Sequence, residues 1–390
     1  MTISSRVPSG LIWFIRLIVA GLFIFSGLIK ANDPMGFGYK LVEYFEVFGL
    51  PFLNDFAVAL AIILCSIEII LGFFLLFGFW IRQTVWGLLL LILFFTFLTF
   101  YSAFFEVVSS CGCFGDAIPL TPWQSFGKDI VLLLLISTLF FFKNQIEPLI
   151  HDRYTQYILA VFIAVLSVGF GVYTHNFLPV VDFLPYKKGN HLPSLMTIPE
   201  GEEIDQYQTI YRLKHRQSGE TKQVTDQEYL EKDLWKDEAW EIVGDPTTRL
   251  IKKGYQIPIA DLMISDGEGN DRTDEIIDNP DFSLLIVAYD IERANAQGLA
   301  QLNELARQMA DDFRTRTVLL TASTGEKVEE NTGHFELYTE VFHADAVPLK
   351  SMVRSNPGLL LLKNGTVIDK WHFHVLPTPE ELAEKYLTEN

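Results

Sequence analysis

The chain has 390 residues, a formal net charge of −18 and 49% hydrophobic residues. Residues 1–186 carry 8 basic and 11 acidic residues, whereas residues 187–390 carry 22 and 37, so the charge is concentrated in the second half. This balance argues against a nucleic-acid-binding protein, because binding to phosphates needs clustered Lys and Arg.

The first half contains five apolar segments, each close to the roughly 20 residues that a helix needs to cross a bilayer. They occupy residues 11–29, 57–81, 84–105, 123–142 and 157–177. We expect helices, because an open chain satisfies its backbone hydrogen bonds in hydrocarbon only as a helix. We therefore predict an α-helical membrane bundle, with a four-helix core over residues 1–150 and a fifth span with a linker over residues 151–190. We expect membrane lipid to contact the outer faces of such a bundle.

The distribution of basic residues predicts the orientation of these spans. If the N-terminus is inside, the inner side holds Arg6, Arg16, Arg82, Lys143 and Arg153. The outer side then holds Lys30, Lys40 and Lys128. Because cytoplasmic loops carry the excess of Lys and Arg, we predict a bacterial inner-membrane protein with a cytoplasmic N-terminus and a periplasmic C-terminal half. Between the first two spans, the aromatic-rich residues 37–49 predict an amphipathic helix on the outer surface.

The loop between the third and fourth spans reads SSCGCFGDAIPL over residues 109–120 and holds two of the three cysteines, Cys111 and Cys113. Cysteines two residues apart close only a very small ring, and Gly112 permits the backbone bend that such a ring needs. A strained disulfide is easily reduced, so the spacing favours an exchangeable redox pair on the oxidising side of the membrane. Three alternatives stay open: free thiols in a tight turn, two ligands of a metal site, or pairing with cysteines of another protein.

The second predicted span contains a carboxylate, Glu68, one helical turn from the third cysteine, Cys65. A charge within hydrocarbon is costly and marks a functional or paired site. Counting from opposite ends of the two spans puts Arg16 within about 6 Å of Glu68 in height. We therefore favour a structural ion pair between Arg16 and Glu68 and keep a proton site for quinone or thiol chemistry as the alternative. Cys65 is predicted to be a buried apolar side chain.

The second half is expected to fold outside the membrane. Four prolines over residues 178–199 mark the end of the membrane part. Residues 191–257 read as an α+β connecting region, with a hairpin around HRQS at residues 215–218 and a helix with a strand-like tail over residues 226–243.

From residue 258 onward, helices and strands alternate. We predict strands at residues 259–265, 282–290 and 317–324, with a helix at residues 294–313 between the last two. A hairpin follows at residues 358–371, turning at Asn364–Gly365, and a closing helix is capped by Thr378. His372 and His374 share a strand face, but no third residue is spaced to complete a metal site.

The order of these elements resembles the thioredoxin fold over residues 258–390. The segment SNPGLLLLKNGTVIDKW at residues 355–371 is similar to the part of that family in which a cis-proline precedes a strand and a Lys-Asn-Gly turn. The resemblance makes Pro357 the cis-proline, on an edge that lies beside bound polypeptide in this family. The family's Cys-x-x-Cys is missing, since residues 287–299 read VAYDIERANAQGL and no cysteine follows Cys113. This domain is therefore expected to pack or dock rather than to exchange dithiols.

The membrane half resembles another family. IRLIVAGLFIFSGLIKANDP at residues 15–34 and SIEIILGFFLLFGFWIR at residues 66–82 are similar to the first two spans of DoxX-like proteins, and the CGCFG that follows the third span is closest to the MauE branch. MauE-type proteins are associated with the maturation of a disulfide-rich enzyme. The combination with a cysteine-free thioredoxin-like tail resembles a two-part family of Bacteroidetes.

Together these patterns favour a protein that takes part in extracytoplasmic thiol–disulfide exchange, or in the maturation of a periplasmic or membrane protein partner. Cys111 and Cys113 would exchange with that partner, and a quinone is the candidate electron acceptor. The rival hypothesis is a non-enzymatic membrane scaffold with a redox-inactive thioredoxin-like domain. A transporter is disfavoured, because few charged residues lie within the spans.

Overall fold

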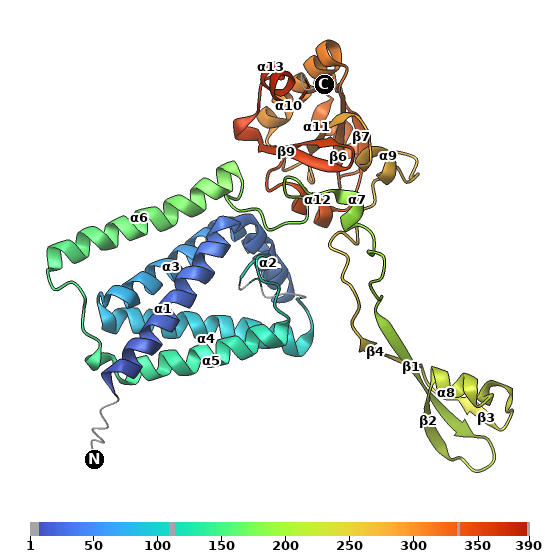
Figure 1. Cartoon of the computed structure of the whole chain (residues 1–390), viewed down its shortest axis with the longest axis horizontal. Coiled ribbons are helices and arrows are strands. Elements are labelled where there is room, and N and C mark those ends of the chain that lie inside the picture. Colours follow the sequence, from blue (N-terminus) through green and yellow to red (C-terminus); the bar gives the residue numbers. More distant parts are fainter. Residues whose placement is uncertain (1–7, 109–111, 113, 334–335, 388–390) are drawn as a thin grey trace. The chain divides into compact units, whose positions relative to one another are not determined.

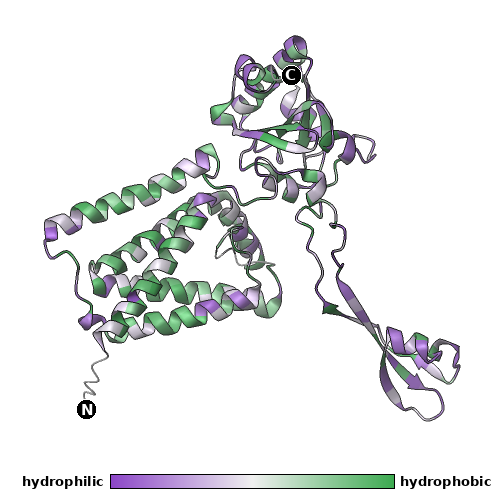
Figure 2. Ribbon diagram, in the orientation of Figure 1, coloured by the Kyte–Doolittle hydropathy of each residue, from purple (hydrophilic) through white to green (hydrophobic). Residues whose placement is uncertain are grey.

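The computed structural model describes residues 8–108, 112, 114–333 and 336–387. Five helices in the described part are long and apolar enough to cross a membrane. They are α1 (Ser9–Asn32), α3 (Ala57–Phe77), α4 (Ile81–Phe105), α5 (Pro122–Phe141) and α6 (Arg153–Phe177) (Figure 1). These five helices lie at the five predicted apolar segments, in the predicted order. Hydrophobic residues dominate these helices, whereas the elements that follow mix hydrophobic and hydrophilic residues (Figure 2).

Helices α1 and α3 run antiparallel in close contact because glycines line their interface. A Cβ atom added at Gly27 of α1 would lie 2.7 Å from Ile69 Cγ1, and one added at Gly72 of α3 would lie 2.7 Å from Ile24 Cγ1. Small residues of this kind let membrane helices approach closely. The same neighbours fix the register of the two helices, with Gly27 beside Glu68 and Gly72 beside Ala20.

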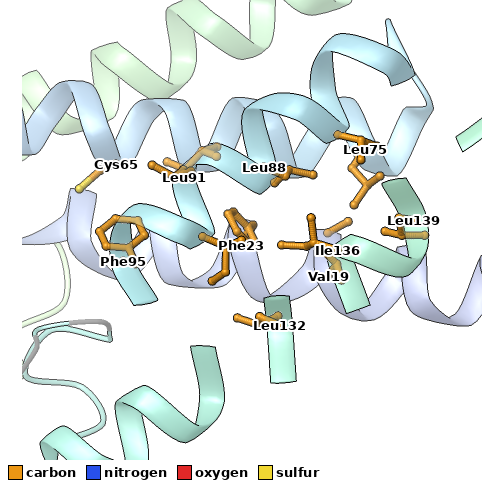
Figure 3. Close-up of a cluster of buried hydrophobic side chains, with 14 of the residues drawn as sticks. Val19, Phe23, Cys65, Leu75, Leu88, Leu91, Phe95, Leu132, Ile136 and Leu139 are labelled. Carbon is orange, nitrogen blue, oxygen red and sulfur yellow. The ribbon is translucent and has the colours of Figure 1, made fainter. Parts of the chain in front are cut away.

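Apolar side chains from α1, α3, α4 and α5 fill the interior of the bundle. Figure 3 shows this core, with labelled members Val19, Phe23, Cys65, Leu75, Leu88, Leu91, Phe95, Leu132, Ile136 and Leu139. Cys65 is fully buried among them, as predicted. Many apolar side chains on the outer faces of the same helices remain exposed, as expected where lipid is the solvent.

The segment between α1 and α3 forms a short helix, α2 (Pro34–Val47), followed by the 3₁₀ helix η1 (Pro51–Phe56). Asp33 caps α2 by accepting a hydrogen bond of 2.9 Å from the backbone N–H of Gly36, and Pro34 occupies the first turn, where its missing N–H costs nothing. The predicted helix at residues 37–49 is therefore present. At the same end of the bundle, a capping box built by Thr121 and Gln124 starts α5.

Residues 191–262 form a separate compact unit. Its elements are α7 (Leu192–Leu195), β1 (Gln206–His215), β2 (Thr221–Thr225), α8 (Asp226–Glu231), η3 (Leu234–Lys236), β3 (Trp240–Ile242) and β4 (Thr247–Lys252). The long strand β1 pairs antiparallel with β2, β3 and β4. The predicted hairpin around residues 215–218 is confirmed, and the helix predicted from residue 226 is short and gives way to η3 and β3.

The C-terminal part carries a five-stranded sheet in the order β7-β6-β5-β8-β9. Its elements are α9 (Thr273–Ile277), β5 (Phe282–Val287), α10 (Ala296–Phe313), β6 (Arg316–Thr321), α11 (Gly325–Thr332), β7 (Glu340–His343), α12 (Ala346–Met352), β8 (Gly358–Lys363), β9 (Thr366–His372), η4 (Phe373–Val375), α13 (Pro379–Leu382) and η5 (Ala383–Leu387). Strands β5, β6 and β7 are parallel, and β8 is antiparallel to both β5 and β9. Asn364 and Gly365 both have positive φ at the β8–β9 turn, as the sequence predicts.

The strand predicted at residues 259–265 is wrong. Only Ser265 makes isolated β-bridges, to Asp271 and to His343. The chain folds back on itself here, since Asp266 accepts hydrogen bonds from the backbone N–H groups of Glu268 and Asn270. The apolar run next to this Asx turn is therefore a loop instead of a sheet strand, with Ile259, Leu262 and Ile264 buried.

Candidate functional site

Cys111 and Cys113 lie outside the described residues, but the residues beside them are placed. We call residues 109–120 the cysteine loop. Gly112 and Gly115 have φ values of 67° and 51°, and Gly115 N donates a hydrogen bond of 3.0 Å to Gly112 O. These are left-handed conformations that glycine adopts without strain. The loop thus makes a tight turn at the glycine whose freedom the sequence singled out.

Phe114 anchors this turn to the helices. Its side chain is buried, its ring centroid lies 5.7 Å from that of Phe25 in α1, and Lys128 Nζ of α5 lies 5.4 Å above the ring. A buried aromatic side chain removes a large apolar surface from solvent. The described part of the cysteine loop around Phe114 is therefore attached to the end of the bundle.

A buried ion pair lies in the bundle near this loop. Lys30 Nζ of α1 contacts Glu68 Oε1 of α3, and the two side chains are only 3% and 2% exposed. Ser26 Oγ donates a hydrogen bond of 3.1 Å to the other carboxylate oxygen of Glu68. Lys30 Nζ also lies 4.6 Å and 5.1 Å from the ring centroids of Phe95 and Phe37, so that aromatic faces complete the surroundings of the cation.

The predicted ion pair between Arg16 and Glu68 is wrong. The register of α1 against α3 places Arg16 about 11 residues from Glu68 along α3, or about 16 Å. Arg16 instead donates to the carbonyl oxygens of Leu75, at 2.8 Å, and Leu76, at 2.9 Å. It also donates to Glu147 O at 3.0 Å. Arg16 therefore closes the C-terminal end of α3, where carbonyls have no partner within the helix.

Two small cavities adjoin Lys30. The first, of about 40 Å³, lies beside the cysteine loop and is lined in part by Lys30, Asp33, Gly112 and Asp116. The second, of about 30 Å³, is lined in part by Lys30, Glu68, Phe114 and Asp129. The first cavity has the more polar lining and is large enough for one or two water molecules, whereas the second is lined mainly by apolar atoms. Lys30 lines both cavities and so connects the loop side of the bundle with the intramembrane carboxylate.

Asp129 is a second buried carboxylate that the sequence interpretation missed. It lies in the second turn of α5, where Thr99 Oγ1 donates to it at 3.0 Å and Lys128 pairs with it. The signal was present in the sequence as a charge inside the fourth apolar run. Lys30 was likewise counted only as an outer-loop charge, although it continues the first span.

Arg354 joins the C-terminal part of the chain to the bundle. Its side chain is 7% exposed, and it donates to Asp33 Oδ2 at 2.8 Å and to Asp116 Oδ2 at 3.3 Å. Burial lowers the pKa of the guanidinium, but Asp33, Tyr39 and Asp116 outweigh this effect, so that the pKa lies above its usual value. No sequence motif marks Arg354, because the contact joins residues more than 200 positions apart.

The peptide bond between Asn356 and Pro357 is cis, the geometry that the sequence resemblance led us to expect. Asn356 Nδ2 donates to Asp290 O at 2.8 Å, and Asn295 N donates to Asn356 O at 3.0 Å. The segment that lacks Cys-x-x-Cys therefore lies directly against the cis-proline loop. Its Tyr289 hydroxyl lies 3.1 Å from the hydroxyl of Tyr39 in α2.

His372 and His374 do come together, with ring centroids 4.6 Å apart. Burial, followed by repulsion from His374 and His175, lowers the pKa of His372 to about 4. His374 Nδ1 lies 3.0 Å from the carbonyl oxygen of Asn176. Within the described ranges, no three His, Cys, Asp or Glu side chains are grouped to hold a metal ion.

Comparison with known proteins identifies the membrane half. Residues 8–142 match the family described as methylamine utilisation protein MauE. The chain is 31% identical over 147 residues to Protein TlpB of Flavobacterium psychrophilum, a match that covers 36% of this chain and 38% of that protein. The chain thus aligns with little more than a third of this relative, and no solved structure matches it. The chain is a multi-pass membrane protein whose N-terminal domain is MauE/DoxX-like.

Proposed function

We propose that the protein carries out thiol–disulfide exchange on the outer side of the membrane through Cys111 and Cys113. The observation that carries the proposal is the left-handed conformation of Gly112, because a bridge between cysteines two residues apart requires the residue between them to bend the backbone. Phe114 fastens this turn to the bundle next to a buried polar cluster. A reactive pair fixed at a membrane surface suits exchange with a partner protein.

The proposed exchange begins with the pair oxidised. A thiolate of the partner attacks one sulfur and forms a mixed disulfide, and a second partner thiolate then releases the pair. The partner gains a disulfide. Cys111 and Cys113 are reduced to two thiols, because they have taken up two electrons and two protons. A membrane quinone is the proposed oxidant that restores the bridge: it accepts those two electrons and two protons and becomes the quinol.

The Lys30–Glu68 pair is the proposed proton site for this cycle. It is buried, it adjoins the cavity beside Gly112, and it is held by Ser26. Ionisable groups within a membrane that border polar cavities commonly serve proton transfer. The proposal therefore gives Glu68 a functional role with Lys30 as its partner.

The C-terminal part is proposed to have a thioredoxin-like fold over residues 258–390. The succession of β5, α10, β6, α12, β8, β9 and α13 and the cis bond before Pro357 support this proposal. Because no cysteine follows Cys113, the proposed role of Pro357 and its loop is binding of protein rather than redox chemistry.

Cells that depend on this protein test the redox proposal. Replacing Cys111→Ser and Cys113→Ser together should leave disulfides of secreted proteins incomplete, which non-reducing electrophoresis measures. Cys65→Ser is the matched control, because Cys65 is fully buried in the bundle core. Normal disulfide formation in cells with the double variant, at wild-type protein levels, would end the redox proposal.

A non-enzymatic scaffold is the second candidate, favoured by the absence of any cysteine after Cys113. A scaffold should keep a stable partner in co-purification and work fully with both loop cysteines replaced. Thiol exchange predicts instead that Cys113→Ser alone accumulates a mixed disulfide with the partner, visible as a reductant-sensitive adduct. In this variant the Cys111 thiolate attacks a disulfide of the partner, the reverse of the proposed step, and the loop has no second thiol to release the partner.

The proposed location is the bacterial inner membrane, with the N-terminus in the cytoplasm and the C-terminal half in the periplasm. A Ser218→Cys variant without the native cysteines places one thiol in the β1–β2 turn. A membrane-impermeant maleimide should label it in intact cells. Labelling only after cell lysis would reverse the proposed orientation.

A further inference from the structure

We infer that Arg354 is a positioning residue by which the C-terminal part of the chain holds the cysteine loop in place. The loop's chemistry is that of the proposed function, so the meaning of this role rests on that proposal. The contact itself does not. It involves Asp116, which stands three residues after Cys113 in the sequence.

The guanidinium of Arg354 uses all three nitrogens. Nε donates to Asp33 Oδ2 at 2.8 Å, Nη2 donates to Asp116 Oδ2 at 3.3 Å, and Nη1 donates to Lys350 O at 2.6 Å. The side chain is 7% exposed, whereas Asp116 is 54% exposed. The planar guanidinium of arginine presents its donors in fixed directions and can make these three hydrogen bonds at once. The compact ammonium group of a lysine cannot do so with the same geometry. Arg354 thus connects the start of α2, the cysteine loop and α12 through one group.

Aromatic contacts strengthen the same junction. Arg354 Cζ lies 5.5 Å and Lys350 Nζ lies 4.8 Å from the ring centroid of Tyr39 in α2. The ring of Tyr39 meets that of Tyr289 edge to face, with centroids 6.4 Å apart. Two cations over one ring and a tyrosine pair make a contact of specific geometry. The loop that precedes Pro357 therefore faces the bundle of its own chain.

Charge explains why one arginine controls the loop. Asp33 and Asp116 both contact Arg354, so removing the guanidinium takes away the cation that they share and leaves Lys40 as the nearby cation that acts on Asp116. Although more than half of the Asp116 side chain is exposed, desolvation by the surrounding protein raises its pKa, an effect that Arg354 opposes. Removing Arg354 should release the loop and add net negative charge near the cysteine pair. Negative charge disfavours thiolate formation, so alkylation of the reduced pair should then need a higher pH.

Four variants of the full-length protein in detergent separate these effects. Arg354→Gln should raise amide hydrogen exchange of residues 114–120 at least about tenfold, the effect of losing a charged hydrogen bond. Asp116→Asn should do the same for the loop and leave exchange in α2 unchanged, because Asp33 keeps its partner. Arg354→Lys should restore only part of the protection. The control is Arg307→Gln, which removes surface pairs with Glu304 and Asp311 and should change nothing in the loop.

The pH profile distinguishes a positioning role from general loosening. Arg354→Gln should move the pH midpoint of alkylation of Cys111 and Cys113 upward by about half a unit, as expected for one added charge a few residues away in the chain. The double variant Arg354→Gln/Asp116→Asn restores the charge balance, so its midpoint should return while its loop exchange stays high. Unchanged loop exchange in both Arg354→Gln and Asp116→Asn would overturn the inference. Amide exchange can also be measured with both cysteines replaced by serine. The inference about Arg354 can therefore fail while the redox proposal stands, and the redox proposal can fail while the inference stands.

Discussion

At the scale of single residues, the buried ion pair of Lys30 and Glu68 is the most distinctive feature of the bundle. Both side chains are nearly inaccessible and lie in adjacent helices. Two opposite charges removed from water repay their desolvation only through each other and through further hydrogen bonds. Ser26 supplies one of these bonds. The loss of either partner should therefore cost more than the loss of both.

We predict that Glu68→Gln and Lys30→Met each destabilise the bundle by about 3–5 kcal/mol, because each leaves an uncompensated buried charge or donor. The double variant should be markedly less destabilised than the sum of the two. Thermal unfolding in detergent measures this coupling. Lys40→Gln is the control, since Lys40 pairs with Glu43 at the surface. Additive effects of Lys30 and Glu68 would show that the pair is not formed.

His372 predicts a pH dependence of the C-terminal part. Its pKa of about 4 in the folded chain lies below the ordinary 6.5, because it is buried next to His374 and His175. The unfolded chain thus binds more protons than the folded chain between pH 6.5 and pH 4. The contribution of neutral His372 to the free energy of unfolding is therefore fully present above pH 6.5, and it is lost as the pH is lowered through that window. We expect a loss of about 2 kcal/mol from pH 8 to pH 5. In unfolding experiments, His372→Asn should lose this component, and an identical pH slope in the variant would contradict the assignment.

At the level of elements, the glycines between α1 and α3 set how closely these helices pack. We predict that Gly72→Val destabilises the bundle by roughly 1–3 kcal/mol, because a Cβ there would lie 2.7 Å from Ile24 Cγ1 and 3.0 Å from Ile24 N. Gly21→Ala is the matched control in α1, where nothing lies within 4 Å of an added Cβ. Thermal unfolding in detergent compares the two. Equal stability of both variants would show that the helices do not pack through Gly72.

The sequence predicted some helices and strands correctly and others wrongly. Five long apolar runs and an Asn–Gly turn determine local structure through their own residues, and the helices and the β8–β9 hairpin followed. The strand expected at residues 259–265 failed, because an Asx turn at Asp266 competed with the sheet. The pairing of Arg16 with Glu68 failed because helix register depends on where Gly27 and Gly72 sit, and counting from helix ends does not capture that.

For the whole molecule, the candidate site depends on contacts that no local pattern encodes. Cys111, Cys113 and Glu68 were recognisable from sequence, since paired thiols and an intramembrane carboxylate stand out by type. Arg354 did not stand out, because its partners come from the start of α2 and from the cysteine loop. The sequence thus predicts which side chains are reactive or ionisable, and the fold determines which of them are in contact.

The redox state of the loop cysteines in intact cells tests the central claim most directly. Cells are quenched with acid, and free thiols are then alkylated with a reagent that adds mass to the protein. If the pair cycles, a Cys65→Ser protein should run as two species, with and without two added groups, and a reductant given to the cells before quenching should convert one into the other. A pair that carries two added groups under every condition, in cells that form secreted disulfides normally, would contradict the account.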